Sequence, residues 1–476
     1  MLPSFCFLRL LAWLAVTAVA GIAAESPAKN PPVAGTVEVS RSPGKPWQAM
    51  AVRTLADLPA IAADPPGGRY GGGGQADGSR ATGFFHTARI ADRWWLIDPE
   101  GRRFIHQGVC SASTIPTAGA QAALKDSFGT QDDWAGKTAA LLHENGFNGL
   151  GGWSNDATLQ PAKSHLVYTK IWNFMSAYGK QRGGTYQKPG HTGYPGDCPF
   201  IFDPGFPAFC DEHARQLAAT KDDPWLLGHF TDNELPWSLK LLDLYLALPA
   251  TDAGRLAAER WLTGRHGPAA SAASITDPDR QEFVAHAADT YFSAVSKAIR
   301  KVDPHHLILG ARFHGSALKL TGLFQAAGRH VDVVSVNYYN AWTPDPERLS
   351  TWAAAAGKPV LITEWYAKGV DSGLDNTSGA GWLVKTQRDR GLFYQNFTLG
   401  LLESRACVGW HWFKYADNDP ADKKTDPSNR DSNKGIVSNR YVPYQPLLDA
   451  MKDLNRRSFG LIEHFDRAAD RPQPSP

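Results

Sequence analysis

Residues 228–237 read GHFTDNELPW and carry polar side chains directly after an apolar run. The segment 224–230, PWLLGHF, is typical of a strand that is buried on both faces, as in a parallel sheet. It continues into Asp232, Asn233 and Glu234. Because burying an unpaired charge is costly, carboxylates at the end of a buried strand indicate a functional site.

Other apolar segments resemble this one and alternate with segments of helical periodicity. The eight predicted strands lie near residues 104–109, 147–153, 166–174, 224–230, 305–312, 331–339, 358–365 and 406–413. Helices are predicted over residues 132–146, 207–221, 281–303, 346–357, 382–404 and 444–455. Eight buried strands covered by helices predict a closed (β/α)8 barrel of the TIM type, an α/β fold. A doubly wound open sheet is the alternative, but no GxGxxG motif follows the first strand to support it.

Composition divides the 476 residues into four parts. Residues 1–24 combine Arg9 with an apolar run that ends in small residues, which predicts a cleaved signal peptide. Residues 25–83 are rich in Pro, Gly, Ala and Ser and predict a leader or linker with at most a strand or two. The barrel is expected over residues 84–459, and residues 460–476 are expected to form a flexible tail.

A signal peptide predicts export, so the mature protein is expected to be secreted or periplasmic, without a stable membrane anchor. A single membrane anchor is the alternative interpretation, but the apolar run from Leu10 to Ala24 is short for a span. Without the signal peptide four cysteines remain, and Cys198 and Cys210 are the pair closest in sequence. Export permits a disulfide between them, and the sequence leaves this open.

Charge and motif content argue against several classes of ligand. The formal net charge is +2 without a basic patch, which argues against nucleic acid. The GGGG run at residues 71–74 lacks the Gly-Lys-Ser/Thr of a phosphate loop. No CxxC spacing occurs, so we expect no structural zinc, no other metal and no cofactor. The 16 tryptophans, by contrast, offer flat faces that suit stacking on sugars.

Further polar and aromatic residues end the other predicted strands, where a barrel of this type carries its chemistry. Glu364 ends the seventh strand, and the fifth, sixth and eighth strands end in Arg312, in Asn337-Tyr338-Tyr339 and in Trp410-His411-Trp412. Two carboxylates across a pocket, Glu234 and Glu364, raise each other's pKa, so that one stays protonated while the other is ionised. Cleavage of a glycosidic bond requires that division.

The sequence resembles the clan A superfamily of retaining (β/α)8 glycoside hydrolases, which carry an Asn-Glu pair after strand four and a second Glu after strand seven. It is most similar to the β-agarase family within that superfamily. The resemblance extends over about residues 84–455. The similar segments are DRWWLIDPEGRRF (92–104), DNEL (232–235), GWHWFKYAD (409–417) and NKGIVS (433–438).

The resemblance implies a role for each matching residue. Glu234 is implied as the acid/base and Glu364 as the nucleophile. Asn233 would bind the 2-hydroxyl of the sugar being cleaved, and Trp412 would form the floor under that sugar. Substrate contacts are also expected from Arg312, Asn337, Tyr339 and Trp365.

Parity along the sixth strand supports part of this assignment. Asn337 and Tyr339 are two residues apart, so both are expected to face the pocket. Tyr339 is the candidate to hold Glu364, and Tyr338 is the alternative.

Structural roles are the alternatives for several of these residues. Glu234 could pair with an arginine or cap a helix, and Glu364 could be an ion-pair partner of Arg312. Asp232 is expected to support the site rather than to react, and Trp410 could belong to the core. The histidines His229, His314 and His411 are interpreted as polar lining of the pocket rather than metal ligands, because no HxH or HExxH occurs near them. Tryptophans near strand ends could be sugar subsites or core packing: Trp153, Trp172, Trp237, Trp342 and Trp365.

Together these features predict a secreted retaining β-glycosidase acting on a polysaccharide or oligosaccharide, agarose-like or another β-galactan. A transglycosylase would use the same residues, with a sugar in place of water, and the sequence does not separate the two. A catalytically inactive carbohydrate-binding barrel is the third hypothesis. The presence of both glutamates, together with Asn233 and Tyr339, argues against it.

Overall fold

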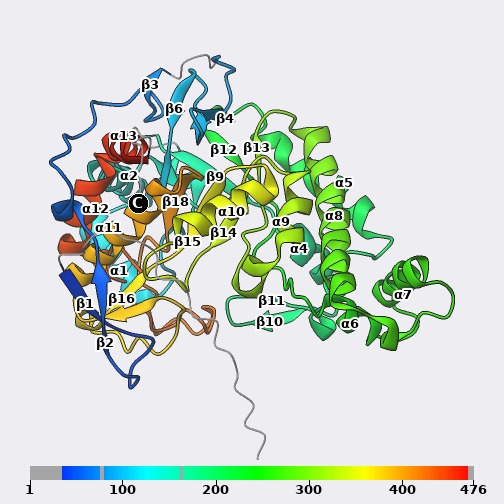
Figure 1. Cartoon of the computed structure of the whole chain (residues 1–476). Helices are drawn as coiled ribbons and strands as arrows, with labels where there is room; N and C mark the ends of the chain where they lie inside the picture. The colour runs from blue at the N-terminus through cyan, green and yellow to red at the C-terminus, as the bar shows by residue number, and fades with distance from the viewer. Residues whose placement is uncertain (1–34, 76–79, 161–164, 470–476) are drawn as a thin grey trace, which may run out of the picture. The chain divides into compact units, whose positions relative to one another are not determined.

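The computed structural model describes residues 35–75, 80–160 and 165–469. Its central sheet has eight parallel strands in the order β13-β12-β9-β8-β7-β18-β15-β14, and helices surround it (Figure 1). These strands are β7 His106–Val109, β8 Gly149–Leu150, β9 Val167–Ile171, β12 Leu226–Phe230, β13 Leu307–Gly310, β14 Val334–Asn337, β15 Val360–Glu364 and β18 Cys407–Trp412. Each predicted strand is present.

The first and last strands of that order close on each other. The backbone N–H of Phe313 donates to Ser335 O at 2.8 Å, and Asn337 N donates to Phe313 O at 2.9 Å. Phe313 and Val336 form a parallel bridge directly after β13. The sheet is therefore a nearly closed barrel, and the predicted TIM-type fold is confirmed. Its carboxyl end is called the mouth below.

Helices follow the strands and cover the outside of the barrel. They are α1 Ala118–Phe128, α2 Gln131–Glu144, α3 Asp156–Leu159, α4 Phe174–Arg182, α5 Phe206–Ala214, α6 Leu241–Leu246, α7 Ala253–His266, α8 Asp277–Val302, α9 Thr321–Gly328, α10 Pro346–Ala356, α11 Gln387–Glu403, α12 Gln445–Asn455 and α13 Ser458–Ala469. The longest, α8, begins at a capping box in which Thr276 and Asp279 bond each other's backbone N–H at 2.7 and 3.3 Å.

The segment predicted as a leader or linker is folded where the structure describes it. Strand β1 (Gly35–Ser40) pairs antiparallel with β2 (Gln48–Val52) and with β17 (Trp382–Val384), which in turn pairs with β16 (Ala367–Gly369). The prediction allowed a strand or two in this segment, and the structure shows β1 and β2 there, paired into the fold instead of forming a free leader or linker. Strand β17, the partner of β1, lies more than 300 residues further along the chain, so sequence patterns give no sign of the pairing. Three valines of β1 and β2 are buried: Val37, Val39 and Val52.

A second antiparallel sheet lies at the other end of the barrel from β16 (Figure 1). Its order is β3-β6-β5-β4, with β3 Gly73–Gln75, β4 His86–Ile90, β5 Arg93–Ile97 and β6 Arg102–Phe104. Residues 98–101 connect β5 to β6 as a hairpin within the DRWWLIDPEGRRF segment. Because β6 runs directly into β7, this sheet covers the amino ends of the barrel strands, away from the mouth.

The C-terminal predictions need two corrections. Residues 460–469 belong to helix α13 and are not a flexible tail. The helix buries three apolar side chains against the core: Leu461, Ile462 and Phe465. The helix predicted over residues 382–404 begins only at Gln387, because Trp382–Val384 form β17. Thr386 caps that helix and accepts from the backbone N–H of Asp389 at 3.1 Å.

Cys198 and Cys210 are both buried free thiols, so they form no disulfide. The predicted signal peptide, residues 1–24, lies outside the described residues. None of the helices that the structure describes is long and apolar enough to cross a membrane.

Candidate active site

The carboxylate of Glu364 is held on both sides at the end of β15. Arg312 Nη2 donates to its Oε1, and the Tyr339 hydroxyl donates to its Oε2. Glu364 is 5% exposed, and Arg312 is completely buried. Each oxygen has its own donor, so the carboxylate has one fixed orientation at the mouth. The Tyr339 contact is the one expected from the sequence.

Arg312 follows β13 in a left-handed backbone conformation, with a φ of 51°. Its guanidinium carbon lies 4.2 Å from the ring centroid of Trp153 and 5.1 Å from that of Phe230. A Cβ at Gly152 would lie 2.3 Å from Arg312 Nη1, so only glycine leaves room there. The expectation that Arg312 contacts substrate is not met, because its side chain is enclosed and paired with Glu364. That ion pair is the structural alternative considered for Glu364.

Glu234 follows β12 and faces the mouth from the opposite side. Its φ of 51° turns the chain away from the strand direction. Asn337 Nδ2 donates to its Oε1 at 2.8 Å, and the Nδ1 atoms of His191 and His314 lie 3.8 and 3.9 Å from its Oε2. Burial, and then the charge of Glu364, raises the pKa of Glu234. Glu234 is therefore suited to hold a proton near neutral pH.

Asn337 connects the ends of three barrel strands. Its Nδ2 donates to Asn233 Oδ1 at 3.2 Å as well as to Glu234, and its Oδ1 accepts from Thr363 Oγ1 at 2.7 Å. Its exposed fraction is 0%, so the expectation of a direct substrate contact is not met. Asn337 positions Asn233 and Glu234 instead. Asn233 itself is partly exposed.

Asp232 supports the site and does not line the mouth, as expected from the sequence. Its carboxylate accepts from the backbone N–H groups of Met175 and Ser176 at 2.8 and 3.2 Å, and from the Tyr291 hydroxyl at 2.6 Å. These bonds attach the end of β12 to the first turn of α4. Burial raises the pKa of Asp232 to about 7. Its oxygens face the protein, so it does not reach the mouth.

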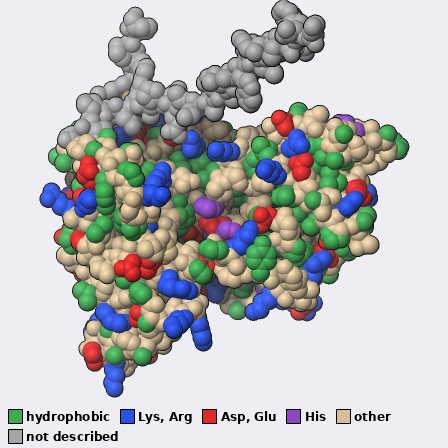
Figure 2. Space-filling view, turned by 90° about the horizontal axis from the view of Figure 1, so that it is seen from below, with side chains coloured by type: hydrophobic (Ala, Val, Ile, Leu, Met, Phe, Trp, Pro, Cys, Tyr) green, Lys and Arg blue, Asp and Glu red, His purple; other side chains and the backbone are tan. Residues whose placement is uncertain are grey.

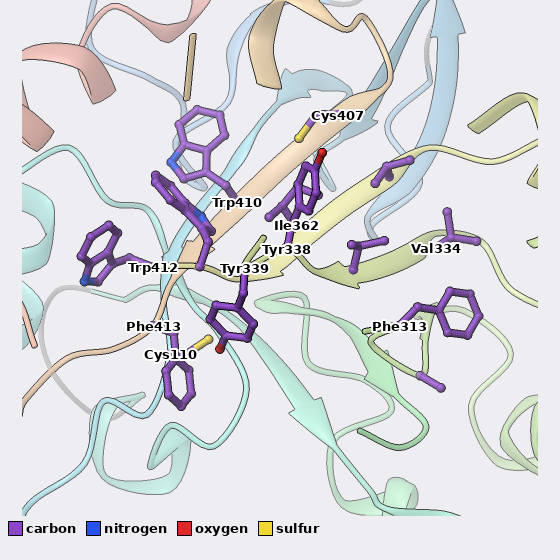
Figure 3. Packing of buried hydrophobic residues seen from close by; sticks show 14 of the residues in the cluster. Cys110, Phe313, Val334, Tyr338, Tyr339, Ile362, Cys407, Trp410, Trp412 and Phe413 are labelled. Atoms are coloured by element: carbon purple, nitrogen blue, oxygen red, sulfur yellow. The ribbon is translucent and has the colours of Figure 1, made fainter. Parts of the chain in front are cut away.

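Tyr338 and Tyr339 point in opposite directions from β14 (Figure 3). Tyr338 packs against Trp352 of α10 and Phe397 of α11, with ring centroids 5.2 and 5.8 Å away. Tyr339 points into the mouth, and burial and the charge of Glu364 raise the pKa of Tyr339. Its hydroxyl therefore stays protonated and remains a donor to Glu364.

Two tryptophans expected to contact substrate are enclosed by protein. Trp412 and Trp365 have exposed fractions of 0%. The indole of Trp412 donates to Lys434 O at 2.8 Å, and Trp365 stacks on Phe397 at 4.2 Å between ring centroids. The predictions of a sugar floor at Trp412 and a substrate contact at Trp365 are wrong in this structure. Both side chains point toward the helix layer, where α11 covers them. Trp410 is buried as well.

Trp153 provides exposed aromatic surface at the mouth instead, and Phe413 packs beside it. Trp153 is 38% exposed and lies edge-to-face with Phe413 at 6.1 Å. Trp153 is one of the strand-end tryptophans singled out in the sequence. Phe413 directly follows β18, and its place in the aromatic run WHWF is the only sequence signal for it.

His229 is engaged by hydrogen bonds within the protein, beside Asp303 at the C-terminal end of α8. Trp172 Nε1 donates to its Nδ1 at 3.0 Å, and its Nε2 lies 2.8 Å from Asp303 Oδ2. His306 Nδ1 lies 2.7 Å from the same oxygen, so the three acidic and imidazole groups are close enough to hold a metal. Because the indole occupies the Nδ1 lone pair, Nε2 of His229 carries a proton and donates to Asp303. The geometry therefore fits a hydrogen-bonded triad better than a metal site.

His411 is also engaged, and it does not reach the mouth. Its Nε2 lies 2.8 Å from His106 Nδ1, and His106 Nε2 lies 3.1 Å from Val167 O. Burial lowers the pKa of His106 to about 4 and that of His411 well below its usual value. Both rings are therefore neutral core residues. His314, beside Glu234, is the one of the three considered histidines that lines the mouth.

Two residues of the site have little signal in the sequence. His191 lies on β11 (His191–Gly193), which pairs with β10 (Tyr186–Lys188) in a short hairpin. Lys434 lies within the NKGIVS segment and contacts the rings of Phe413 and Tyr366. Figure 2 looks onto the side of the molecule that carries this hairpin, and shows histidine and acidic side chains together in a hollow.

Comparison with known proteins identifies the family. No family model matches the chain. The crystal structure of BpGH50 superposes with a TM-score of 0.80 and is 30% identical, covering 90% of this chain and 96% of that one. The chain belongs to glycoside hydrolase family 50.

Two curated relatives of this family 50 chain come from Vibrio sp. (strain JT0107). β-Agarase B is 24% identical over 81% of this chain, and β-agarase A is 26% identical over 82%. The chain spans about half the length of these relatives, 49% and 48% respectively. A solved agarase, AgWH50C, shares the fold at a TM-score of 0.69 and 22% identity, covering 84% of this chain and 67% of that one.

Proposed function

We propose that this protein hydrolyses agarose or a related β-galactan with retention of configuration. The observation that supports this proposal is that the two glutamates have different surroundings. Glu364 has a donor on each carboxylate oxygen, Arg312 on one and Tyr339 on the other. Glu234 has a raised pKa, and among the residues that the structure describes none places a cationic donor within hydrogen-bond distance of it. We therefore assign Glu364 as the nucleophile and Glu234 as the residue that carries the proton.

In the first step Glu364 attacks the anomeric carbon and forms a covalent glycosyl-enzyme. Glu234 gives its proton to the departing glycosidic oxygen. Arg312 and Tyr339 hold the attacking carboxylate in place, which lowers the entropic cost of reaching the reactive geometry. Asn233, held by Asn337 at 3.2 Å, is in place to bond a hydroxyl of the same sugar.

In the second step water replaces the departed sugar. Glu234, now ionised, takes a proton from that water as it attacks the anomeric carbon, and Glu364 is released. A sugar hydroxyl in place of water would give transglycosylation on the same residues. Retention follows from two inversions and requires the carboxyl groups to be about 5–5.5 Å apart.

The substrate proposal rests on the relatives named as β-agarases and on the aromatic surface at the mouth. Trp153, which is exposed and supported by Phe413, presents an aromatic surface of the kind that packs on sugars. The Arg9-containing apolar leader supports export, and N-terminal sequencing of secreted protein tests it. A mature chain that begins near Gly21 or Glu25 is expected, whereas intact Met1 in the cytoplasm would contradict export.

The test is to incubate the protein with agarose, other algal galactans and plant galactans, and to follow the products by size and by NMR. Oligosaccharides from an agarose-type galactan, released first as the retained anomer, are expected. Initial release of the inverted anomer would make Glu364 a general base. Cleavage of plant galactans alone would contradict the substrate class.

A further inference from the structure

The β10–β11 hairpin turns one of its faces toward Glu234. In its antiparallel pairing Tyr186 lies opposite Gly193, and Lys188 lies opposite His191. Residues directly opposite each other, and residues two apart along a strand, share a face, so these four lie on one face of the hairpin. His191 Nδ1 lies 3.8 Å from Glu234 Oε2. The face that carries these four residues, called the inner face below, is therefore the one turned toward the site.

The turn of the hairpin is fixed beside Glu234. Pro189 and Gly190 connect the two strands, and Gly190 has a φ of 88°, as the third residue of a type II turn requires. Its backbone N–H donates to both oxygens of Asp426 at 2.9 and 3.0 Å, and Gln187 Nε2 donates to Asp426 at 2.8 Å. A Cβ at Gly190 would lie 4.0 Å from Glu234 Oε2. Asp426, in the loop after β18, thus holds the hairpin at the mouth.

The assigned roles place the hairpin on the side of the leaving group. Glu234 Oε1 accepts from Asn337 at 2.8 Å, whereas no described residue donates to Oε2 within hydrogen-bond distance. As the acid, Glu234 gives its proton to the departing glycosidic oxygen, so the sugar beyond that oxygen has to lie beside Oε2. His191 and His314 flank Oε2 at 3.8 and 3.9 Å. The first sugar of the leaving group is therefore expected beside these two rings.

Tyr186 presents an exposed ring further along the inner face. The residue is 50% exposed. It lies one step of two residues beyond the pair of Lys188 and His191, about 7 Å along the strand. Lys188 Nζ lies 6.0 Å from the ring centroid and is paired with Asp197. The ring is thus placed for the sugar that follows the one beside His191.

Gly193 gives the Tyr186 ring its position. A Cβ at Gly193 would lie 2.5, 2.6 and 2.8 Å from three atoms of that ring. The backbone of Gly193 is outside the left-handed region, so its conformation does not demand glycine. The close approach of the ring does. The ring is therefore supported by the backbone of the opposite strand, while half of the residue stays exposed.

We infer that Tyr186 stacks on the second sugar of the leaving group, with Gly193 leaving the space for its ring. A supported, half-exposed aromatic ring suits the apolar face of a sugar, and its hydroxyl can bond to the sugar's edge. Figure 2 shows hydrophobic side chains around the hollow that contains histidine and acidic groups. The inference rests on the proposed function, because it takes Glu234 as the acid and a sugar chain as the substrate.

Two substrates with the same glycone test this role. One is an aryl glycoside of an agarose-type disaccharide, whose leaving group contains no sugar, and the other is an agarose-type hexasaccharide. The ratio of their kcat/KM values, hexasaccharide over aryl glycoside, isolates binding of the leaving-group sugars. We expect Tyr186→Ala to lower this ratio roughly tenfold, because binding energy from the remote sugar is lost. Tyr186→Phe keeps the ring and should keep most of the ratio.

Thr192→Ala is the matched control, because it removes a side chain from the opposite face of the same hairpin and should keep the ratio. Gly193→Ala should lower the ratio, since the added Cβ displaces the Tyr186 ring. In the Tyr186→Ala background the same change should have no further effect, because the ring that it displaces is gone. This comparison can be made with the hexasaccharide alone. Melting temperatures check that each variant folds.

The outcomes separate the inference from the proposed function. An unchanged ratio in Tyr186→Ala would overturn the inference and leave hydrolysis of the galactan intact. An equal fall in Thr192→Ala would overturn it too, since the hairpin as a whole would then be responsible. Additive losses from Tyr186→Ala and Gly193→Ala would contradict the role given to Gly193. Cleavage of neither substrate by the unaltered protein would count against the proposed function itself, and the inference would fall with it.

Discussion

Tyr339 and Glu364 meet because β14 and β15 are neighbours in the barrel. Asn337 is in register with Glu364 in the parallel pairing of these strands, and Tyr339 lies two residues further on. Its hydroxyl reaches Oε2 of the glutamate that Arg312 holds at Oε1. The orientation of the Glu364 carboxylate therefore depends on side chains from two other strands.

Tyr339→Phe removes one of these two donors while keeping the ring. A hydrogen bond to a charged group contributes about 1.5–3 kcal/mol, so kcat should fall roughly 10–100-fold with a smaller change in KM. Steady-state kinetics on a soluble oligosaccharide measure this. Tyr338→Phe is the control, since that side chain points away from the mouth and should leave kcat nearly unchanged. Equal losses in the two variants would show that Tyr339 has no special role.

The Glu364→Gln and Glu234→Gln variants should lose activity on different sets of substrates. Without its nucleophile the Glu364 variant cannot form the glycosyl-enzyme, and activity should fall by several orders of magnitude on every substrate. The Glu234 variant should lose activity on polysaccharide, yet keep a nearly normal first step on an aryl glycoside whose leaving group needs no proton. Pre-steady-state release of the aryl group measures that step.

Azide provides an independent check on the same assignment. A small anion attacks the glycosyl-enzyme without a general base, so azide should speed turnover by Glu234→Ala on the aryl glycoside and give a glycosyl azide. The Glu234→Ala product should be the retained glycosyl azide, because azide attacks the glycosyl-enzyme. Glu364→Ala forms no glycosyl-enzyme, so any azide product from it should have the inverted configuration, from direct displacement of the aryl group. The opposite pair of configurations would exchange the two roles.

The activity should depend on pH through Glu234. As the acid, Glu234 must be protonated, and its raised pKa extends kcat/KM toward higher pH before activity declines. The Asn337 hydrogen bond stabilises the ionised form, so Asn337→Ala should raise the pKa of Glu234 further. The decline at high pH should then move upward, with a lower maximum rate. A shift to lower pH would contradict the assigned role of this bond.

Gly152→Ala tests the space beside Arg312. The added Cβ would lie 2.3 Å from Arg312 Nη1, so the guanidinium has to move. Its hydrogen bond to Glu364 is then weakened or lost. We expect at least about a tenfold loss of kcat, comparable to removing one charged hydrogen bond. Gly136→Ala is the control, because a Cβ there meets nothing within 4 Å. In the middle of α2 it should leave kcat intact and stabilise the fold by about 0.5–1 kcal/mol in thermal unfolding.

The sequence was sufficient to predict the barrel and to place Glu234 and Glu364 at strand ends, because both features leave local signals. Each barrel strand is a short apolar run bounded by helical periodicity, and a carboxylate at the end of such a run stands out from its surroundings. Parity along the sixth strand was enough to select Tyr339 over Tyr338, since alternation is a property of the extended backbone itself.

Only the tertiary structure decided what each polar group contacts. Arg312, Asn337 and Trp412 end their strands as expected, yet they are enclosed by side chains from elements distant in sequence, and contact the protein instead of the mouth. Strand β1 has its partner at β17, and Lys434 reaches the site from a loop after the last barrel strand. Such contacts depend on long-range packing, which local periodicity does not encode. The two glutamates and the Tyr339 contact to Glu364 could therefore be predicted from the sequence, whereas the enclosure of Arg312, Asn337 and Trp412 could not.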